Sequence, residues 1–226
     1  MNGSNINLHL LLQNSFMINC SMGFKTISFP ESHTSYIVPS FAELDELTFQ
    51  ISQKILDKGI AVDRVVTLAK GGWPMTRSMV DYLQVDKVAS IGVRFYSGIN
   101  QRLERPEIYQ DVPVSVSGER VLLFDDVADT GESMEYVVEY LQYKNVAEVV
   151  TASLFYKSRS SLTPDFVGAH TDAWIIFPFE RREIAKTLLH QWFTSKISKK
   201  EAQKRLRQLL YPDDQIEYYV STYFHT

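Results

Sequence analysis

LFDDVADTGES, residues 123–133, is the stretch that decides how this chain folds. An apolar run from Val121 to Phe124 leads into it and ends in two adjacent carboxylates, Asp125 and Asp126. A third carboxylate, Asp129, follows, and apolar side chains then recur at the i, i+3, i+4, i+7 spacing of a helix at Met134, Val137, Val138 and Leu141. The pattern predicts a buried strand, a tight acidic loop and a helix N-terminus.

This arrangement suits a phosphorylated sugar. Ligands of open α/β sheets bind at the carboxyl ends of strands, and a helix N-terminus with a glycine and hydroxyl groups suits a phosphate. The neighbouring carboxylates repel a phosphate but can hold sugar hydroxyls, a metal or a proton. The alternative is a solvated turn with an aspartate cap. Three acids and a hydroxyl-rich turn directly after an apolar strand favour the ligand site.

The segment resembles the phosphoribosyl-diphosphate (PRPP) signature of type I phosphoribosyltransferases. The resemblance implies that Asp125 and Asp126 bind the ribose hydroxyls. It implies that the next residues wrap the 5-phosphate: Ala128, Asp129, Thr130, Gly131, Glu132 and Ser133. Asp129 also matches an acid that faces purine N7 in the hypoxanthine, guanine and xanthine enzymes, where a carboxylate can accept a proton. Asp129 is therefore the expected catalytic residue.

A second loop, Ala69-Lys70-Gly71-Gly72, follows an apolar strand. Two glycines let backbone N–H groups approach a ligand, and the lysine adds positive charge. An ordinary strand–helix turn is the alternative, because a Gly-Gly pair alone is a weak signal. The loop is similar to the diphosphate loop of the family, which implies that Lys70, Gly71 and Gly72 bind diphosphate and that the Ala69–Lys70 peptide bond is cis.

The base-binding residues are also implied by the resemblance. Lys157 ends a strand and matches a lysine that donates to purine O6. Trp174 would stack on the base, and the backbone of Ile175 would read its edge. Glu180 stands near an acid, usually Asp, that helps to hold a second Mg²⁺, so Asp125, Asp126 and Glu180 are the expected metal ligands. The run from Trp174 to Pro178 looks most like compact xanthine/guanine enzymes of archaeal type.

Outward from these motifs, strands and helices alternate, which predicts an α/β fold with a parallel sheet. A capping box at Ser40–Glu43 opens a helix that Gly59 stops, and a second one is expected at Ser198–Glu201. Further helices are expected over 74–83 and 182–193, and strands over 65–69, 88–96, 148–156 and 173–178. Residues 211–226 show no motif.

The resemblance implies the type I phosphoribosyltransferase fold: a central, mostly parallel sheet flanked by helices, with a small hood. Residues 1–34 are expected to be an N-terminal extension, 35–193 the phosphoribosyltransferase domain and 194–226 a C-terminal helical appendage. The polar connection 97–118 is a candidate lid, since long connections in compact domains are often functional. Arg94, Tyr96 and Ser97 are its candidate contacts.

Composition narrows the class of protein. The chain has 226 residues, 45% of them hydrophobic, which suffices for one α/β domain with appendages. A net charge of −4 disfavours nucleic acid as a partner, and the single cysteine excludes a disulfide framework or a cysteine metal site. No apolar run approaches the roughly 20 residues of a membrane span. We therefore expect no membrane association and a cytoplasmic location.

The resemblance thus implies a Mg²⁺-dependent purine salvage enzyme. Its substrates would be PRPP and a 6-oxopurine, that is xanthine, guanine or hypoxanthine, and the resemblance implies a homodimer or homotetramer. One alternative is a transferase for another base, which Asp129 and Lys157 disfavour. The other is a PRPP-binding regulatory protein without catalysis, for which only the C-terminal segment could supply a partner module.

Overall fold

A six-stranded sheet forms the centre of the computed structural model, which describes residues 23–30, 32–94, 97–98, 101–102 and 106–223. In sheet order its strands are β10 (Phe166–His170), β9 (Glu148–Tyr156), β8 (Arg120–Ala128), β3 (Arg64–Ala69), β4 (Val88–Arg94) and β7 (Glu107–Gln110). Every neighbouring pair is parallel except β4 with β7. The predicted α/β class with a mostly parallel sheet is confirmed.

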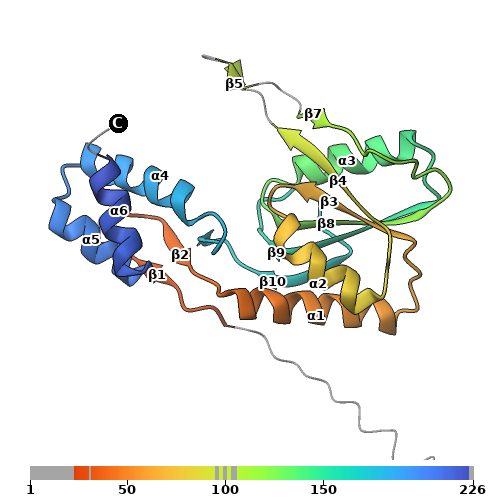
Figure 1. The fold of residues 1–226 in the computed structure, drawn as a ribbon, viewed down its shortest axis with the longest axis horizontal. Helices are drawn as coiled ribbons and strands as arrows, with labels where there is room; N and C mark the ends of the chain where they lie inside the picture. Colours follow the sequence, from red (N-terminus) through yellow and green to blue (C-terminus); the bar gives the residue numbers. More distant parts are fainter. Residues whose placement is uncertain (1–22, 31, 95–96, 99–100, 103–105, 224–226) are drawn as a thin grey trace, which may run out of the picture.

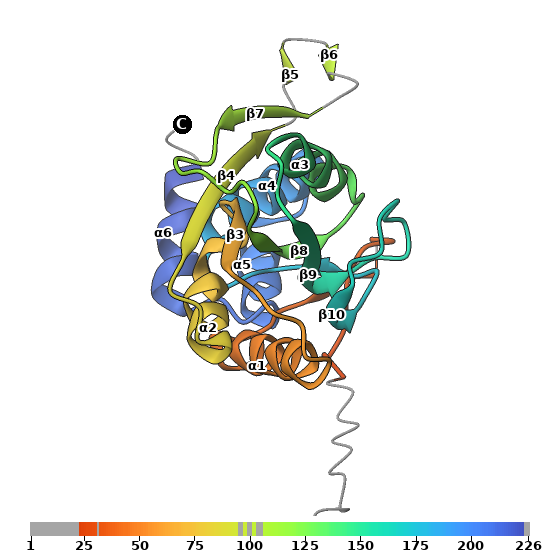
Figure 2. The same ribbon diagram turned by 90° about the vertical axis from the view of Figure 1, so that its right-hand side faces the viewer.

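Helices cover both faces of this sheet (Figure 2). Helices α1 (Phe41–Asp57) and α2 (Trp73–Leu83) lie on one face and α3 (Glu132–Tyr143) on the other. The apolar run of β8 contributes side chains to the cores on both faces of the sheet, because successive side chains of a strand point to opposite faces. Leu122 and Phe124 join the core under α1 and α2, whereas Val121 and Leu123 join the core under α3. An apolar strand without alternation is thus one buried on both faces.

A second unit, the hood, lies to one side of the sheet (Figure 1). It combines a small sheet with three helices: β1 (Ile27–Ser28), β2 (Ser35–Ile37), β11 (Trp174–Ile175), α4 (Arg181–Thr194), α5 (Lys199–Gln208) and α6 (Asp213–Tyr223). Its own core includes Phe29, Trp192, Leu206 and Ile216. Arg205 is buried in it, with its guanidinium over the Phe29 ring at 5.0 Å and paired with Glu201. The described part of 1–34 therefore contributes β1 and Phe29 to the hood.

The acidic stretch is not the tight loop that the sequence predicts. Strand β8 continues through Asp125 and Asp126 to Ala128, because β9 runs alongside and stays in register from Asp125–Ser153 to Ala128–Tyr156. The Ser153 hydroxyl accepts the Ala128 N–H at 3.0 Å and so supports the last residue of the strand. Both carboxylates consequently project from a fixed strand end and not from a turn.

Other local predictions also need correction. The connection 97–118 is not wholly irregular: it holds β7, which pairs with the sheet edge, and a two-stranded tip of β5 (Ser97–Gly98) and β6 (Gln101–Arg102). The strand expected at 173–178 shrinks to β11 and joins β2, outside the main sheet. Residues 213–223, for which no motif was found, form α6, and strand β10 was missed.

The predicted helix starts are mostly confirmed. Ser40 and Glu43 form the complete capping box of α1, and Gly59 follows its end with φ +66. At Ser198 the hydroxyl accepts the Glu201 N–H.

Of the candidate lid contacts, Arg94 pairs with Glu107 at 3.2 Å, Ser97 lies in β5 and Tyr96 lies outside the described residues. Over the part of the chain that the structure describes, helices long and apolar enough to cross a membrane are absent.

Candidate functional site

The predicted sugar-phosphate residues line one cavity at the carboxyl end of β8. This cavity of about 290 Å³ is bounded by Asp125, Val127, Ala128, Asp129, Thr130, Gly131, Ser133 and Met134. Strand β8 supplies one side of it, and the first turn of α3 supplies the other. Of the residues predicted to bind ribose and 5-phosphate, Asp126 and Glu132 do not line this cavity. The rest are brought together as the sequence predicts.

The N-terminus of α3 offers backbone donors to this cavity. Its N-cap residue is Gly131, in the left-handed region at φ +82, and no side chain caps the helix. The first N–H groups of a helix lack intrahelical partners, so these remain available to an anion. A side chain at 131 would also collide with the next loop, since a Cβ there would lie 2.6 Å from Ser160 Oγ. Glycine is required here by both backbone angle and space.

The two carboxylates at the end of β8 point into different surroundings. Asp126 is buried, and a Cβ added to Gly71 would lie 2.5 Å from its oxygens, so the glycine loop packs directly on this carboxylate. Burial and the Glu180 carboxylate raise the pKa of Asp126 to about 7. Burial and the Asp126 carboxylate raise the pKa of Asp125 well above its ordinary value. Both shifts identify a place where a cation or hydroxyl donors would be stabilised.

The glycine loop after β3 sits beside the acidic pair. The Ala69–Lys70 peptide bond is cis, as the resemblance implied. Gly72 is buried so tightly that a Cβ would meet Thr67 Oγ1 at 2.3 Å and the Phe124 carbonyl at 2.8 Å. Lys70 lines a second cavity of about 560 Å³ together with Trp73, Pro74, Phe179, Glu180, Arg182, Glu183 and Lys186. The loop therefore connects the acidic pair to a cavity that holds Lys70 and Glu180.

Asp129 is held by two cations. Lys157 Nζ lies 3.0 Å from Asp129 Oδ1, and the Arg159 guanidinium donates to both carboxylate oxygens at 2.5–3.0 Å. Burial by itself raises the pKa of Asp129, but the hydrogen bonds from Arg159 and Lys157 outweigh it and hold that pKa below its ordinary value. Asp129 is thus an ionised acceptor, and a ligand that approaches it also meets Lys157.

The predicted base-binding residues come from separate elements and converge. Lys157 is only 7% exposed and follows β9, whereas Trp174 belongs to β11 in the hood and is 45% exposed. Lys157 Nζ lies 5.7 Å from the centroid of the Trp174 ring. Ile175 is buried and in register with Ile37 of β2. An exposed indole beside a buried ammonium group forms a place where a flat, polar ring can stack.

The carboxylates at this site fit a metal ion that is bound jointly by protein and substrate. They fit a metal centre made of protein ligands alone less well. Among the described residues, no group of three or more His, Cys, Asp or Glu side chains is arranged to hold a metal ion. Mg²⁺ is usually bound by one or two carboxylates together with substrate phosphates and water. Asp125 and Asp126 supply such carboxylates, and burial together with the neighbouring carboxylates raises the pKa of both.

Sequence reasoning missed two supporting residues. Arg159 makes the closest contacts to Asp129, but a lone arginine in a polar loop carries no pattern that assigns it a partner 30 positions away. Ser153 sits inside an apolar strand, where its hydroxyl accepts from Ala128 and donates to Phe155 O at 2.6 Å. A polar residue in the middle of an apolar strand is a signal that could have identified it.

A family model described as the phosphoribosyl transferase domain matches residues 36–182, which include every residue that the sequence predicts for the site. Among solved structures, a purine phosphoribosyltransferase from Pyrococcus horikoshii Ot3 is similar with a TM-score of 0.58 and 27% identity, over 64% of this chain and 93% of that one. Residues 36–182, which the family model matches, contain all six strands of the central sheet and helices α1 to α3.

Curated relatives match this chain at low sequence identity and over only part of their length. A hypoxanthine-guanine phosphoribosyltransferase of Bacillus subtilis (strain 168) is 24% identical over 119 residues, which are 49% of this chain and 64% of the relative. A xanthine-guanine phosphoribosyltransferase of Idiomarina loihiensis is 27% identical over 146 residues, which are 62% of this chain and 84% of the relative. The chain thus spans less than two thirds of the Bacillus subtilis relative's length.

Proposed function

This chain belongs to the phosphoribosyl transferase domain family, and we propose that within it the protein transfers the 5-phosphoribosyl group from PRPP to N9 of a 6-oxopurine, releasing diphosphate. The bond from ribose C1 to the diphosphate oxygen breaks, and a bond from C1 to N9 forms. Such a reaction passes through a positively charged sugar, so positioning and electrostatics supply most of the catalysis. The following roles are part of this proposal.

The sugar phosphate occupies the cavity at the end of β8. The 5-phosphate accepts hydrogen bonds from the uncapped N–H groups of α3 and from Thr130 and Ser133. Asp125 and Asp126 accept from the ribose hydroxyls. Lys70 and the amides of Gly71 and Gly72 meet the diphosphate, which lies toward the cavity shared with Glu180. A polyanionic substrate is thus held by donors at both of its ends.

The base lies between Trp174 and the ion pair of Lys157 with Asp129. Lys157 donates to O6, Asp129 takes the N7 proton, and the backbone of Ile175 reads the edge of the ring. This pattern favours a 6-oxopurine, because the 6-amino group of adenine presents a donor to the lysine. A site whose side chains hydrogen-bond one group of the substrate strongly rejects an analogue that lacks this group. The choice among xanthine, guanine and hypoxanthine is left to the assay.

Mg²⁺ is the proposed cofactor. Asp125 and Asp126, with Glu180 as a third candidate ligand, would hold the ion against the substrate's oxygens. The ion supplies charge stabilisation to the departing diphosphate. A homodimer or homotetramer, a cytoplasmic location, and the absence of nucleic-acid or membrane partners remain parts of the proposal.

We propose that residues 35–193 form the transferase domain, that residues 1–34 are an N-terminal extension and that residues 194–226 are a C-terminal appendage. Helix α4 spans most of the last residues of the transferase domain, yet its buried face shares the hood core with α5 and α6. We therefore expect the appendage to be needed for the stability of the hood, although it supplies no residue of the proposed site.

The convergence of Asp129, Lys157 and Trp174 from three elements carries this proposal. The test is a steady-state assay of the full chain with PRPP, Mg²⁺ and, in turn, xanthine, guanine, hypoxanthine and adenine, with the nucleoside monophosphate measured by chromatography. We expect turnover with at least one 6-oxopurine and little with adenine. Preference for adenine would overturn the assigned base class. Binding of PRPP without turnover on any base would instead identify a regulatory protein.

A further inference from the structure

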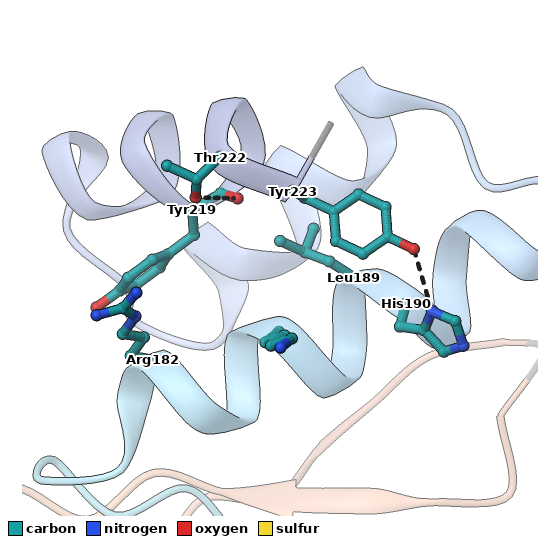
Figure 3. Close-up of a pocket in the computed structure, with 7 residues that line it drawn as sticks. Arg182, Leu189, His190, Tyr219, Thr222 and Tyr223 are labelled. Atoms are coloured by element: carbon teal, nitrogen blue, oxygen red, sulfur yellow. Dashed lines mark hydrogen bonds between the residues drawn. The ribbon is translucent and has the colours of Figure 1, made fainter. Parts of the chain in front are cut away.

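A third cavity lies in the hood, away from the acidic pair, between α4 and α6. It measures about 460 Å³ and is lined by Arg182, Lys186, Leu189, His190, Tyr219, Thr222 and Tyr223 (Figure 3). We call it the α4–α6 cavity. Its volume falls in the range of about 300–1,000 Å³ that is typical of small-molecule sites. The cavity is therefore large enough for a small organic molecule.

One wall of the α4–α6 cavity is basic. Arg182, Lys186 and His190 are spaced four residues apart and therefore lie along one stripe of α4. Among the described residues, neither Arg182 nor Lys186 pairs with a carboxylate. Like charges one turn apart repel each other, so such a stripe is a cost to the free protein. The stripe is therefore suited to an anion.

Basic side chains on other helices of the protein do form ion pairs with carboxylates. On α5, Arg205 and Lys204 pair with Glu201, and Arg207 pairs with Asp213. On α2, Arg77 pairs with Asp81. Glu180 and Glu183 share the cavity that contains Lys70 with Arg182 and Lys186, but among the described residues no ion pair joins these acids to those two cations. The charges of Arg182 and Lys186 are therefore not neutralised by a protein carboxylate, which suits an anion from solution.

The opposite wall is aromatic and fixed in place. Tyr219 and Tyr223 lie one turn apart on α6 and are half-buried. The Tyr219 ring packs edge-on against Tyr211, and the Tyr223 ring packs against Phe193 at 5.0 Å. The Tyr223 hydroxyl also bonds His190 Nδ1 at 3.2 Å. Figure 3 shows Arg182 and Tyr219 toward one end of the cavity and His190 and Tyr223 toward the other.

We propose that the α4–α6 cavity binds a nucleoside monophosphate, with its phosphate at Arg182 and Lys186 and its base beside Tyr219 and Tyr223. A cationic stripe recognises the phosphate, and aromatic rings recognise the flat base. Arg182 and Lys186 also line the cavity that contains Lys70. The α4–α6 cavity therefore adjoins, through these two shared cations, the cavity toward which the proposed function places the diphosphate.

Calorimetric titration of the full chain with GMP tests this site. If the proposed function holds, the catalytic site also accepts GMP, so we expect two GMP molecules per chain. Tyr219→Leu and His190→Ala, whose positions line only the α4–α6 cavity, should each weaken one event by about tenfold or more, the scale of one lost base-stacking contact. Tyr143→Leu is the matched control, because Tyr143 ends α3, is 82% exposed and does not line the cavity.

The outcomes separate the two proposals. Trp174→Ala should remove GMP binding at the catalytic site. If it does not, the proposed base site is contradicted, but the α4–α6 site is not. A single GMP event that only Trp174→Ala weakens, or two events that His190→Ala and Tyr219→Leu leave unchanged, would overturn the α4–α6 site. Guanosine and inorganic phosphate are the remaining probes, and each should bind there more weakly than GMP. If Tyr219→Leu fails to fold, the exposed His190→Ala decides.

Discussion

Replacing Lys157 with methionine removes a single charge from the proposed base site with little change in shape. Lys157 is 7% exposed, its ammonium group lies 3.0 Å from Asp129 and it faces the Trp174 ring at 5.7 Å. Methionine keeps the length of the aliphatic stem and suits a buried position. Asp129 keeps both hydrogen bonds from Arg159. The variant therefore leaves no buried charge without a partner, and we expect it to fold.

The magnitude follows from the lost contact to the base. A hydrogen bond that involves a charged group contributes about 1.5–3 kcal/mol. Because Lys157 is buried and poorly screened, we place the loss in the upper part of that range, about 2–3 kcal/mol, which corresponds to roughly a 30- to 150-fold rise in KM for guanine or hypoxanthine. The KM for PRPP should change little, since Lys157 does not line the sugar-phosphate cavity.

Steady-state kinetics at saturating PRPP measure this effect, with Lys144→Met as the matched control. Lys144 also pairs with a carboxylate, Asp111 at 3.0 Å, but stands at the far end of α3. Its variant should keep wild-type kinetics. The ratio of adenine to guanine use should rise in Lys157→Met, because the donor that disfavours adenine is gone. An unchanged KM for the base together with a raised KM for PRPP would refute the assignment of Lys157.

Three further predictions concern the same site and the core. Asp129→Asn should keep PRPP binding, measured by calorimetry, but lower kcat by about 100-fold, the scale of one acid–base group; wild-type turnover would exclude the role. Arg159→Gln should raise KM for the base by less than Lys157→Met does, because Arg159 is more exposed, and a larger effect would make Arg159 the main contact. Glu119→Gln should lower the free energy of unfolding by about 1–3 kcal/mol at pH 7, because Arg64 and Lys87 lose their charged acceptor. Those partners lower the pKa of Glu119 to about 2, so this stabilisation is present above pH 4.5 and is lost as the pH falls toward 2; a difference between wild type and variant in urea unfolding that persists at pH 2 would contradict it.

The sequence predicted the parts of the fold that local patterns determine. The capping box of α1 and the apolar periodicity of α3 are short-range signals, and both helices begin where those signals stand. The length of β8 was wrong because its last residues depend on pairing with β9, which sequence periodicity does not show. Strand β11 was misplaced for the same reason, since its partner β2 lies far away in the chain.

The candidate site shows the same difference between local and long-range signals. Residues such as Gly131 and Lys70 could be proposed from the sequence because each stands in a short motif at a strand–helix turn. Arg159 and Ser153 were missed because their roles depend on partners from another strand. From the sequence, no role was assigned to Arg182, Lys186 and His190, because they form a cavity wall only through the packing of α6 against α4.

The loop after β9 explains how these separately recognised motifs form one unit. The Lys157 N–H donates to Ala128 O at 3.1 Å, and the Ser161 N–H donates to Thr130 O at 2.8 Å. The loop that carries Lys157 and the turn at Thr130 are therefore joined by backbone hydrogen bonds. Gly131 lies against the same loop, at a distance that leaves no room for a Cβ. A displacement of the turn at Thr130 and Gly131 would consequently also move the loop that carries Lys157 and Arg159.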